Sequence, residues 1–286
     1  EAVELLNLKS DSVVVDATFG NGGHGKEMVK ELKDGIYIGL DIDETALNQE
    51  HLGSTTCEVF LIHENFGNIK EVLSSLNIKR VDSILADLGW RIEQFTNQEK
   101  GLSFMHDGPL YMTLGNPDDY PFTAVDIVNE WDEGTIADII YGYSDERFAR
   151  RIAKAIVEER KVRRIETTTD LVKIVDKAIP HKAKRRNINP ATKTFQALRI
   201  AVNEELKVLE DFIRDGFSVL KPGGTMAIIT FHSIEDRVVK HCFRELVQAE
   251  VGSLLNKKPI IPTQEEIEAN PRSRSAKLRI ITKNEI

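Results

Sequence analysis

A glycine-rich segment near the start of the chain has the composition of a loop that binds a nucleotide-like ligand. It reads DATFGNGGHG over residues 16–25 and follows a short β-branched apolar run. Glycines in such a loop let the backbone approach a ligand closely and direct its N–H groups toward it. Gly20, Gly22 and Gly25 also match the spacing G-x-G-x-x-G, which alone leaves a nicotinamide-dependent oxidoreductase open.

Acidic residues near this loop narrow the choice of ligand. Asp41 ends the second predicted strand and is suited to accept hydrogen bonds from two ribose hydroxyls; its structural alternative is a helix N-cap. Asp16 lies before the glycines, where a carboxylate disfavours a pyrophosphate and suits the amino-acid portion of S-adenosylmethionine; its alternative is a turn cap. Together with the LKPGG turn before a later strand, these residues favour S-adenosylmethionine as the cofactor.

Strand and helix patterns that could position these residues lie toward the two ends of the sequence. Apolar runs predict strands over 12–19, 35–43, 57–66, 81–89, 225–231 and, antiparallel to the others, 276–283. Helical spacing predicts helices over 24–32, 68–76, 237–246 and a single long one over 194–220. Strands that alternate with helices indicate a parallel sheet, whose ligands bind at the carboxyl ends of the strands.

The middle of the chain has helix patterns without convincing strands. We therefore predict a helical insertion over 101–191 within an α/β core formed by 1–100 and 192–286. The net charge is −8, yet residues 147–199 hold 16 Lys and Arg against 5 Asp and Glu. Such a basic section on an acidic body favours a polyanion-binding face, with a solvated helical surface as the structural alternative.

Composition excludes several classes of protein. Of the 286 residues, 41% are hydrophobic and 29% charged, which is typical of a globular chain. No run approaches the roughly 18 apolar residues of a membrane span, and no secretory or transit signal is visible. With only two cysteines, far apart, we expect neither a disulfide framework nor a metal site, and we expect a cytoplasmic protein without a membrane partner.

Segments along almost the whole chain resemble the bacterial 16S ribosomal RNA cytosine-N4 methyltransferases of the MraW/RsmH type. The most distinctive are TFQALRIAVN, FHSIEDR and NPRSRSAKLR, joined by VDATFGNGGHG, GLDID, ILADLG, GLSFMHDGPL and LKPGG. The resemblance implies a Rossmann-like class I methyltransferase sheet with an inserted helical domain for RNA recognition. It also implies S-adenosylmethionine as cofactor and 16S ribosomal RNA or the small ribosomal subunit as partner. The oligomeric state stays open, with a dimer among the possibilities.

The resemblance also implies which residues form the site. Cofactor contacts carried over by position are Gly22, Gly23, His24, Asp41, Phe66, Asp87 and Gln94, to which the loop chemistry adds Asp16 and Gly20. Phe66 would flank the adenine ring or else belong to the core. Asp87 would orient a cytosine amine and accept its hydrogen bond. His232 would accept a proton beside Asp87, or else be a buried histidine satisfied by Glu235 or Asp236.

On the substrate side the sequence departs from the family pattern. After Asp87-Leu-Gly89 and after Leu110, two acids and an arginine of the family are replaced. Trp90 then occupies a position from which it would stack on a flipped base or pack under the insertion. Phosphate contacts are expected from Arg147, Arg151, Lys154, Lys184, Arg185 and Arg186. The lost residues leave an alternative: a noncatalytic or retargeted RNA-binding assembly factor that kept the fold.

Overall fold

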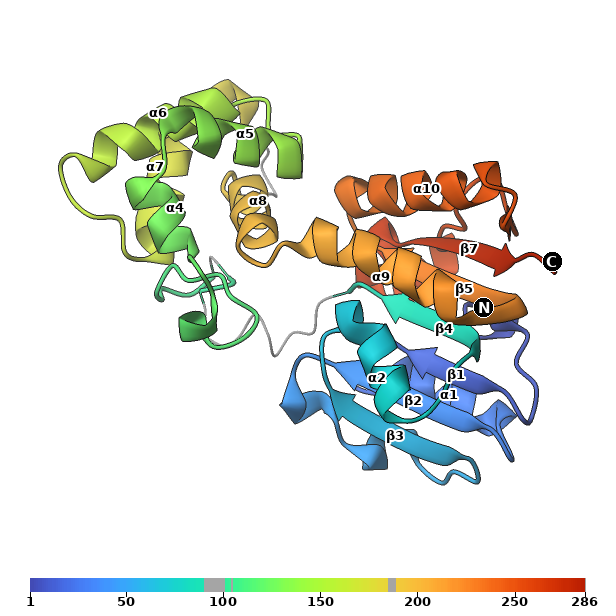
Figure 1. Ribbon diagram of the computed structural model, residues 1–286. Coiled ribbons are helices and arrows are strands. Elements are labelled where there is room, and N and C mark those ends of the chain that lie inside the picture. The colour runs from blue at the N-terminus through green and yellow to red at the C-terminus, as the bar shows by residue number, and fades with distance from the viewer. Residues whose placement is uncertain (90–100, 104, 185–188, 286) are drawn as a thin grey trace. The chain divides into compact units, whose positions relative to one another are not determined.

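The chain forms two compact units, each described here by itself. The computed structural model describes residues 1–89, 101–103, 105–184 and 189–285 (Figure 1). The core unit consists of Glu1–Gly89 and Leu206–Ile286, and the helical unit is Trp90–Glu205. Within the described residues, no helix is long and apolar enough to cross a membrane.

The core unit contains a sheet whose order is β3-β2-β1-β4-β5-β7-β6 in the described part of the chain. Its strands are β1 (Val13–Asp16), β2 (Ile36–Asp41), β3 (Glu58–His63), β4 (Val81–Asp87), β5 (Leu220–Thr230), β6 (Gly252–Leu254) and β7 (Lys277–Lys283). Strands β1 to β5 pair in parallel, whereas β7 is antiparallel to both β5 and β6. The order reverses between β1 and β4, which confirms the predicted α/β sheet, and a ligand crevice at that point stays a prediction.

Helices cover both faces of this sheet because alternate strand residues are apolar on both sides. In β1, Val15 packs with α2 (Ile69–Ser75), α9 (Glu205–Val219) and α10 (Ser233–Gln248). Its neighbour Val14 packs on the opposite face with α1 (Gly23–Glu31). A short α11 and several single-turn 3-10 helices complete the described core unit: α11 (Gln264–Ala269), η1 (Glu4–Leu6), η2 (Glu44–Ala46), η3 (Gln49–Leu52), η4 (Phe66–Asn68) and η7 (Pro271–Ser275). Apolar clusters on both faces of the sheet thus hold its strands in place.

The helical unit has a hydrophobic core of its own. Its described helices are α4 (Ala124–Glu130), α5 (Glu133–Ser144), α6 (Ala149–Arg160), α7 (Thr168–Ala178) and α8 (Thr192–Val202), with the short η5 (Pro117–Asp119) and η6 (His181–Ala183). Ile140, Ile152, Leu171 and Leu198, from four of these helices, are fully buried together. The unit can therefore hold its shape through its own packing.

The single long helix predicted over 194–220 is wrong, since two helices occupy that stretch. The helix breaks after α8 at Asn203, and Glu204 takes a left-handed conformation with φ of 48°. The Asn203 side chain donates to the carbonyl of Met112 at 2.8 Å and accepts the N–H of Leu114 at 2.9 Å. These long-range bonds stop the helix, and local periodicity cannot reveal them.

This break also moves the boundary of the insertion. The sequence placed the insertion at 101–191, whereas the compact units divide after Gly89 and after Glu205. Helix α8 belongs to the helical unit because Phe195, Leu198 and Val202 are buried in its core. Its amphipathic pattern showed a buried face but could not show which core buries it.

The LKPGG segment differs from the predicted simple turn. It lies within β5, where the pairing with β4 shifts between Val81↔Leu220 and Ser83↔Thr225. Gly223 has a φ of 76°, which glycine adopts without strain. The edge strand β6, only three residues long, carries too little pattern to be predicted.

Asn203→Ala should destabilise the helical unit by about 1–3 kcal/mol, because it removes the hydrogen bonds of this side chain to the Met112 carbonyl and from the Leu114 N–H. Urea unfolding followed by circular dichroism measures this change. Glu158→Ala is the matched control: its pair with Lys154 is exposed and 3.8 Å long, so a loss within about 0.5 kcal/mol is expected. Equal losses in the two variants would contradict the role of Asn203.

Candidate functional site

The glycine loop joins β1 to α1 at the carboxyl edge of the sheet. Gly20 and Gly22 have φ of 54° and 69°, conformations that residues with a Cβ rarely adopt. A Cβ on Gly22 would lie 2.9 Å from the Cβ of His51, so this position has no room for a side chain. Among the described residues, apart from the neighbours of Gly23 and its own helix backbone, no atom lies within 4 Å of a Cβ built there, and the first turn of α1 begins at this residue. The loop therefore leaves room for a ligand beside the first turn of α1, where helix N–H groups lack partners within the helix.

Asp41, the last residue of β2, ties that strand to the loop. Its Oδ2 accepts the N–H of Gly20 at 2.8 Å, and its Oδ1 accepts the N–H of Asp43 at 2.8 Å. Asp41 does not cap a helix here, since Asp43 caps η2. Its contact with ribose hydroxyls stays a prediction.

Asp16 ends β1 and is 1% exposed. The hydroxyl of Tyr37 donates to its Oδ2 at 2.8 Å, and the N–H of Thr18 donates to its Oδ1 at 3.3 Å. Burial raises the pKa of Asp16 to about 6, against the opposing effects of Tyr37 and His24. Sequence reasoning missed Tyr37, although a tyrosine within an apolar strand needs a partner for its hydroxyl. The contact of Asp16 with the cofactor stays a prediction.

Asp87 ends β4 and lies beside the glycine loop. Its N–H donates to Thr18 Oγ1 at 2.6 Å, and its Oδ1 accepts the N–H of Gly89 at 3.2 Å. Its Oδ2 lies 3.3 Å from Nε2 of His24, in the first turn of α1. The hydrogen bond to Asp87 is the main cause that raises the pKa of His24 above its ordinary value, although burial opposes it. Asp87 is therefore held by groups on the loop, the helix and its own turn.

His232 contacts Glu235, and its predicted place beside Asp87 stays a prediction. It follows β5 and caps α10, where its Nδ1 accepts the N–H of Glu235 at 3.3 Å. The Glu235 carboxylate accepts the N–H groups of Phe231 and His232 in return. Nε2 of His232 lies 2.9 Å from Glu235 Oε1, at an angle unsuited to a hydrogen bond. This capping matches the structural alternative, and proton acceptance by His232 stays a prediction.

Phe66 lies after β3 and not at its end, because that strand ends at His63. It begins η4, and its ring meets Phe212 of α9 edge to face with centroids 5.0 Å apart. Phe66 is half-buried, so one part of the ring is held while the other is accessible. Four predicted site residues lie outside the described residues: Trp90, Gln94, Arg185 and Arg186.

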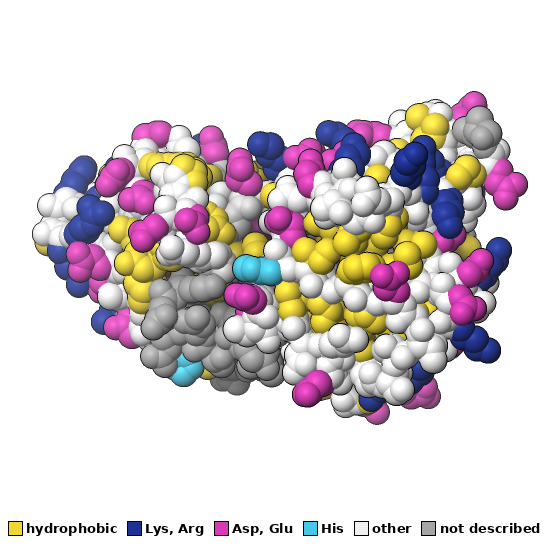
Figure 2. All heavy atoms as spheres, turned by 60° about the horizontal axis from the view of Figure 1, so that its bottom comes forward, with side chains coloured by type: hydrophobic (Ala, Val, Ile, Leu, Met, Phe, Trp, Pro, Cys, Tyr) yellow, Lys and Arg dark blue, Asp and Glu magenta, His cyan; other side chains and the backbone are white. Residues whose placement is uncertain are grey.

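The basic residues predicted to contact phosphates differ in their surroundings. Arg147, Arg151 and Lys154 are exposed, and their spacing of four and three residues places them along one side of α6 and the residues before it. Lys154 Nζ lies 3.8 Å from Glu158. Lys184 Nζ lies 2.6 Å from Asp176. Figure 2 shows Lys and Arg side chains gathered along the margin of the helical unit, at the left of the view.

These groups fit a cofactor that carries both a nucleoside and an amino acid. Open space beside Gly23 and the start of α1 suits a carboxylate, Asp41 is a carboxylate of the kind that binds hydroxyls, and Phe66 offers an aromatic face. All of them lie at or just after the carboxyl ends of β1, β2 and β3. S-adenosylmethionine has each of the complementary groups.

The sequence matches the model of the MraW methylase family over residues 1–284. The chain belongs to this family. A ribosomal RNA small subunit methyltransferase H from Clostridioides difficile is 44% identical over 99% of this chain and 96% of that protein. The protein of the same name from Limosilactobacillus fermentum is 41% identical over 98% of this chain and 95% of its own. A solved rRNA methylase from Streptococcus thermophilus is 13% identical, with a TM-score of 0.45, and the match covers 99% of this chain and 92% of that one.

Membership confirms the resemblance that the motifs predicted. It decides against the nicotinamide-dependent oxidoreductase, which rested on three glycines alone. The family match continues through the helical unit, so the insertion is part of the family pattern.

Asp16→Asn should raise the free energy of unfolding near pH 7 by up to about 3 kcal/mol, because the amide removes the cost of a buried charge. The pKa of Asp16 is raised in the folded state. The contribution of Asp16 to wild-type stability therefore falls as the pH rises from about 4 to about 6 and is constant above that range. The difference in unfolding free energy between the Asp16→Asn variant and wild type should therefore grow from about pH 4 to about pH 6 and stay constant above that range.

Urea unfolding at several pH values tests this expectation. Asp11→Asn is the matched control, because its carboxylate is exposed in the same unit and its replacement should leave the pH course unchanged. A gap between the Asp16 variant and wild type that is independent of pH would show that Asp16 bears no extra cost of ionisation.

Proposed function

We propose that this chain transfers a methyl group from S-adenosylmethionine to the exocyclic N4 amine of a cytosine in 16S ribosomal RNA. The observation that carries the proposal is Asp87, fixed at the carboxyl end of β4 next to the glycine loop, in a chain of the MraW methylase family. The names of the relatives, small-subunit ribosomal RNA methyltransferases, support the RNA substrate. We place the reaction in the cytoplasm, with the small subunit or its RNA.

The glycine loop and the neighbouring strand ends would hold the cofactor. The Gly22 N–H donates to the carbonyl of Phe19 at 2.8 Å, so the N–H groups of Gly23 and His24, in the first turn of α1, would meet the cofactor. Asp41 would accept from the ribose hydroxyls. When bound, S-adenosylmethionine supplies an electrophilic methyl group on a sulfonium. The His24 ring already contacts Asp87 through Nε2, so we assign the methionine carboxylate to the backbone amide of His24.

A cytosine N4 amine is a weak nucleophile, because its lone pair is delocalised into the ring. The protein must therefore hold N4 in line with the reacting carbon and accept a hydrogen bond from the amine. Asp87 supplies a carboxylate held by His24 at Oδ2 and by the N–H of Gly89 at Oδ1, while Thr18 holds its backbone N–H. The amine proton passes to this carboxylate during or after transfer.

The target cytosine must leave any base stack to reach this carboxylate. Arg147, Arg151 and Lys154 on the helical unit would hold RNA phosphates, and such contacts position a strand without reading its sequence. Lys184 contributes less, since Asp176 already neutralises it. In this proposal the helical unit binds the RNA strand and the core unit carries out the transfer.

The noncatalytic assembly factor is the weaker alternative. Asp16, Asp41 and Asp87 are all present with partners that hold them in place. The relatives at 41–44% identity are named as methyltransferases. A chain that had lost catalysis would have no need to keep a charged pair at the end of β4, given the cost of its desolvation.

Asp87→Ala should lower the single-turnover rate of methyl transfer by about 100-fold or more, at saturating S-adenosylmethionine. The reason is that the amine then lacks its acceptor while the fold persists. Tritiated-methyl transfer to small subunits from a strain without the enzyme measures the rate. The exposed Asp11→Ala variant serves as control and should match wild type. A near-normal rate for Asp87→Ala refutes the assignment.

Removing phosphate contacts should weaken the salt dependence of RNA binding. Arg151→Ala should lower the slope of log affinity against log salt by roughly 1, and Arg147→Ala combined with Arg151→Ala by roughly 2. Filter binding between about 50 and 200 mM salt measures the slopes. Arg163→Ala is the matched control, because Arg163 is paired with Glu159 and Asp170. An unchanged slope in the double variant would place the RNA elsewhere.

A further inference from the structure

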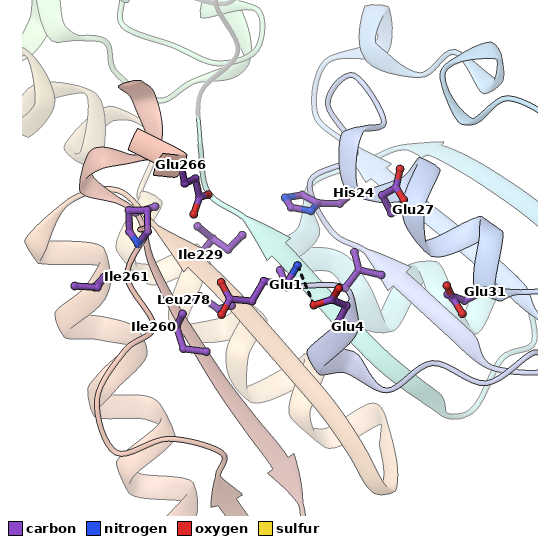
Figure 3. Close-up of a pocket in the computed structure, with 14 residues that line it drawn as sticks. Glu1, Glu4, His24, Glu27, Glu31, Ile229, Ile260, Ile261, Glu266 and Leu278 are labelled. Carbon is purple, nitrogen blue, oxygen red and sulfur yellow. Dashed lines mark ion pairs between the residues drawn. The ribbon is translucent and has the colours of Figure 1, made fainter. Parts of the chain in front are cut away.

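A hollow of about 500 Å³ opens on the α1 side of the sheet (Figure 3). His24 lines one side of it, while Ile229 of β5 and Leu278 of β7 line another. Ile229 is the residue that pairs with Asp87 between β4 and β5. The histidine that contacts Asp87 therefore also borders a space open to water.

The charges around this hollow are mostly negative. Its lining includes the carboxylates of Glu1, Glu4, Glu27, Glu31 and Glu266. A lining of this kind repels RNA phosphates and favours a positive charge on a group that faces it. The hollow is thus unsuited to the RNA backbone and suited to an imidazolium.

The groups that face His24 come from several elements. Asp87 on β4 and Asp16 on β1 both favour its protonated form, whereas burial and the amino group of Glu1 oppose it. Glu27 lies on the same helix, but Lys30 occupies its carboxylate at 2.6 Å. Asp16 itself is held by Tyr37 of β2. The nearest partner, Asp87, has the largest effect.

We propose that His24 is the positioning residue of this site: as an imidazolium, it donates Nε2–H to Asp87 Oδ2 and holds that carboxylate ready for the target amine. This inference rests on the proposed function and deepens it. The family resemblance implied only that His24 contacts the cofactor. In this proposal its side chain also orients the Asp87 carboxylate.

The chemistry of the amine explains why a cation beside the acceptor does not slow the reaction. Transfer forms the N4–C bond and breaks the S–C bond, whose electron pair stays on sulfur. The amine then carries a positive charge and is strongly acidic, so even a weakly basic carboxylate takes its proton, which passes on to water. Alignment of Asp87 is therefore what limits the rate, and a misplacement of about 1 Å can cost about 100-fold.

The proposal sets the direction of the pH dependence. The pKa of His24 is raised, so the imidazolium is present below that pKa and is lost as the pH rises through it. The single-turnover rate should then fall on the alkaline side.

Single-turnover rates across this pH range, at saturating S-adenosylmethionine, test the proposal with three variants. His24→Gln keeps an N–H near the position of Nε2 but cannot ionise, so the alkaline fall should disappear. His24→Ala should lose about 100-fold in rate while titration calorimetry shows that S-adenosylhomocysteine still binds. Glu27→Gln, on the same helix and the same hollow, should match wild type.

A second readout follows the ring itself. NMR titration of His24 should give a lower pKa in Asp87→Asn than in wild type, because the main charge partner is gone. An alkaline fall that persists in His24→Gln, a wild-type rate in His24→Ala, or a His24 pKa unchanged in Asp87→Asn each overturns the proposal. If wild type transfers no methyl group, the proposed function fails, and the NMR titration still decides whether the pair exists.

Discussion

Three carboxylates end three adjacent parallel strands, and the structure around the site depends on keeping them close together. Asp41, Asp16 and Asp87 close β2, β1 and β4, which are neighbours in the sheet. Like charges at such spacing repel, and a buried carboxylate also loses its hydration. Each is therefore compensated differently: Asp41 by backbone N–H groups, Asp16 by the Tyr37 hydroxyl and a raised pKa, and Asp87 by His24.

This compensation explains the shape of the loop between β1 and α1. Gly20 must turn its N–H toward Asp41, and Gly22 must pass the His51 side chain without a Cβ. The same turn carries Thr18 under Asp87 and starts α1 so that His24 reaches the carboxylate. The glycine loop and the Asp87 carboxylate are thus joined by hydrogen bonds into one unit.

How far the sequence could predict this site differed from residue to residue. Strand ends at Asp41 and Asp87 follow from near-continuous apolar runs, because both faces of this sheet are buried. The partner of Asp87 was predicted as His232, from the adjacency of β4 and β5. That adjacency is confirmed, but His232 turns back to cap α10 with Glu235. The cap is a local feature, but the sequence alone does not show whether His232 caps α10 or accepts a proton beside Asp87.

The sequence by itself determined the family, the parallel sheet and the glycine loop, because these depend on short-range patterns and on motifs that occur together. Only the tertiary structure decided the pairing of His24 with Asp87, the burial of Asp16 against Tyr37, and the helix break at Asn203. Each of these joins residues between 21 and 91 positions apart. Periodicity records which side of an element is buried, whereas a hydrogen bond between distant side chains depends on where two elements meet.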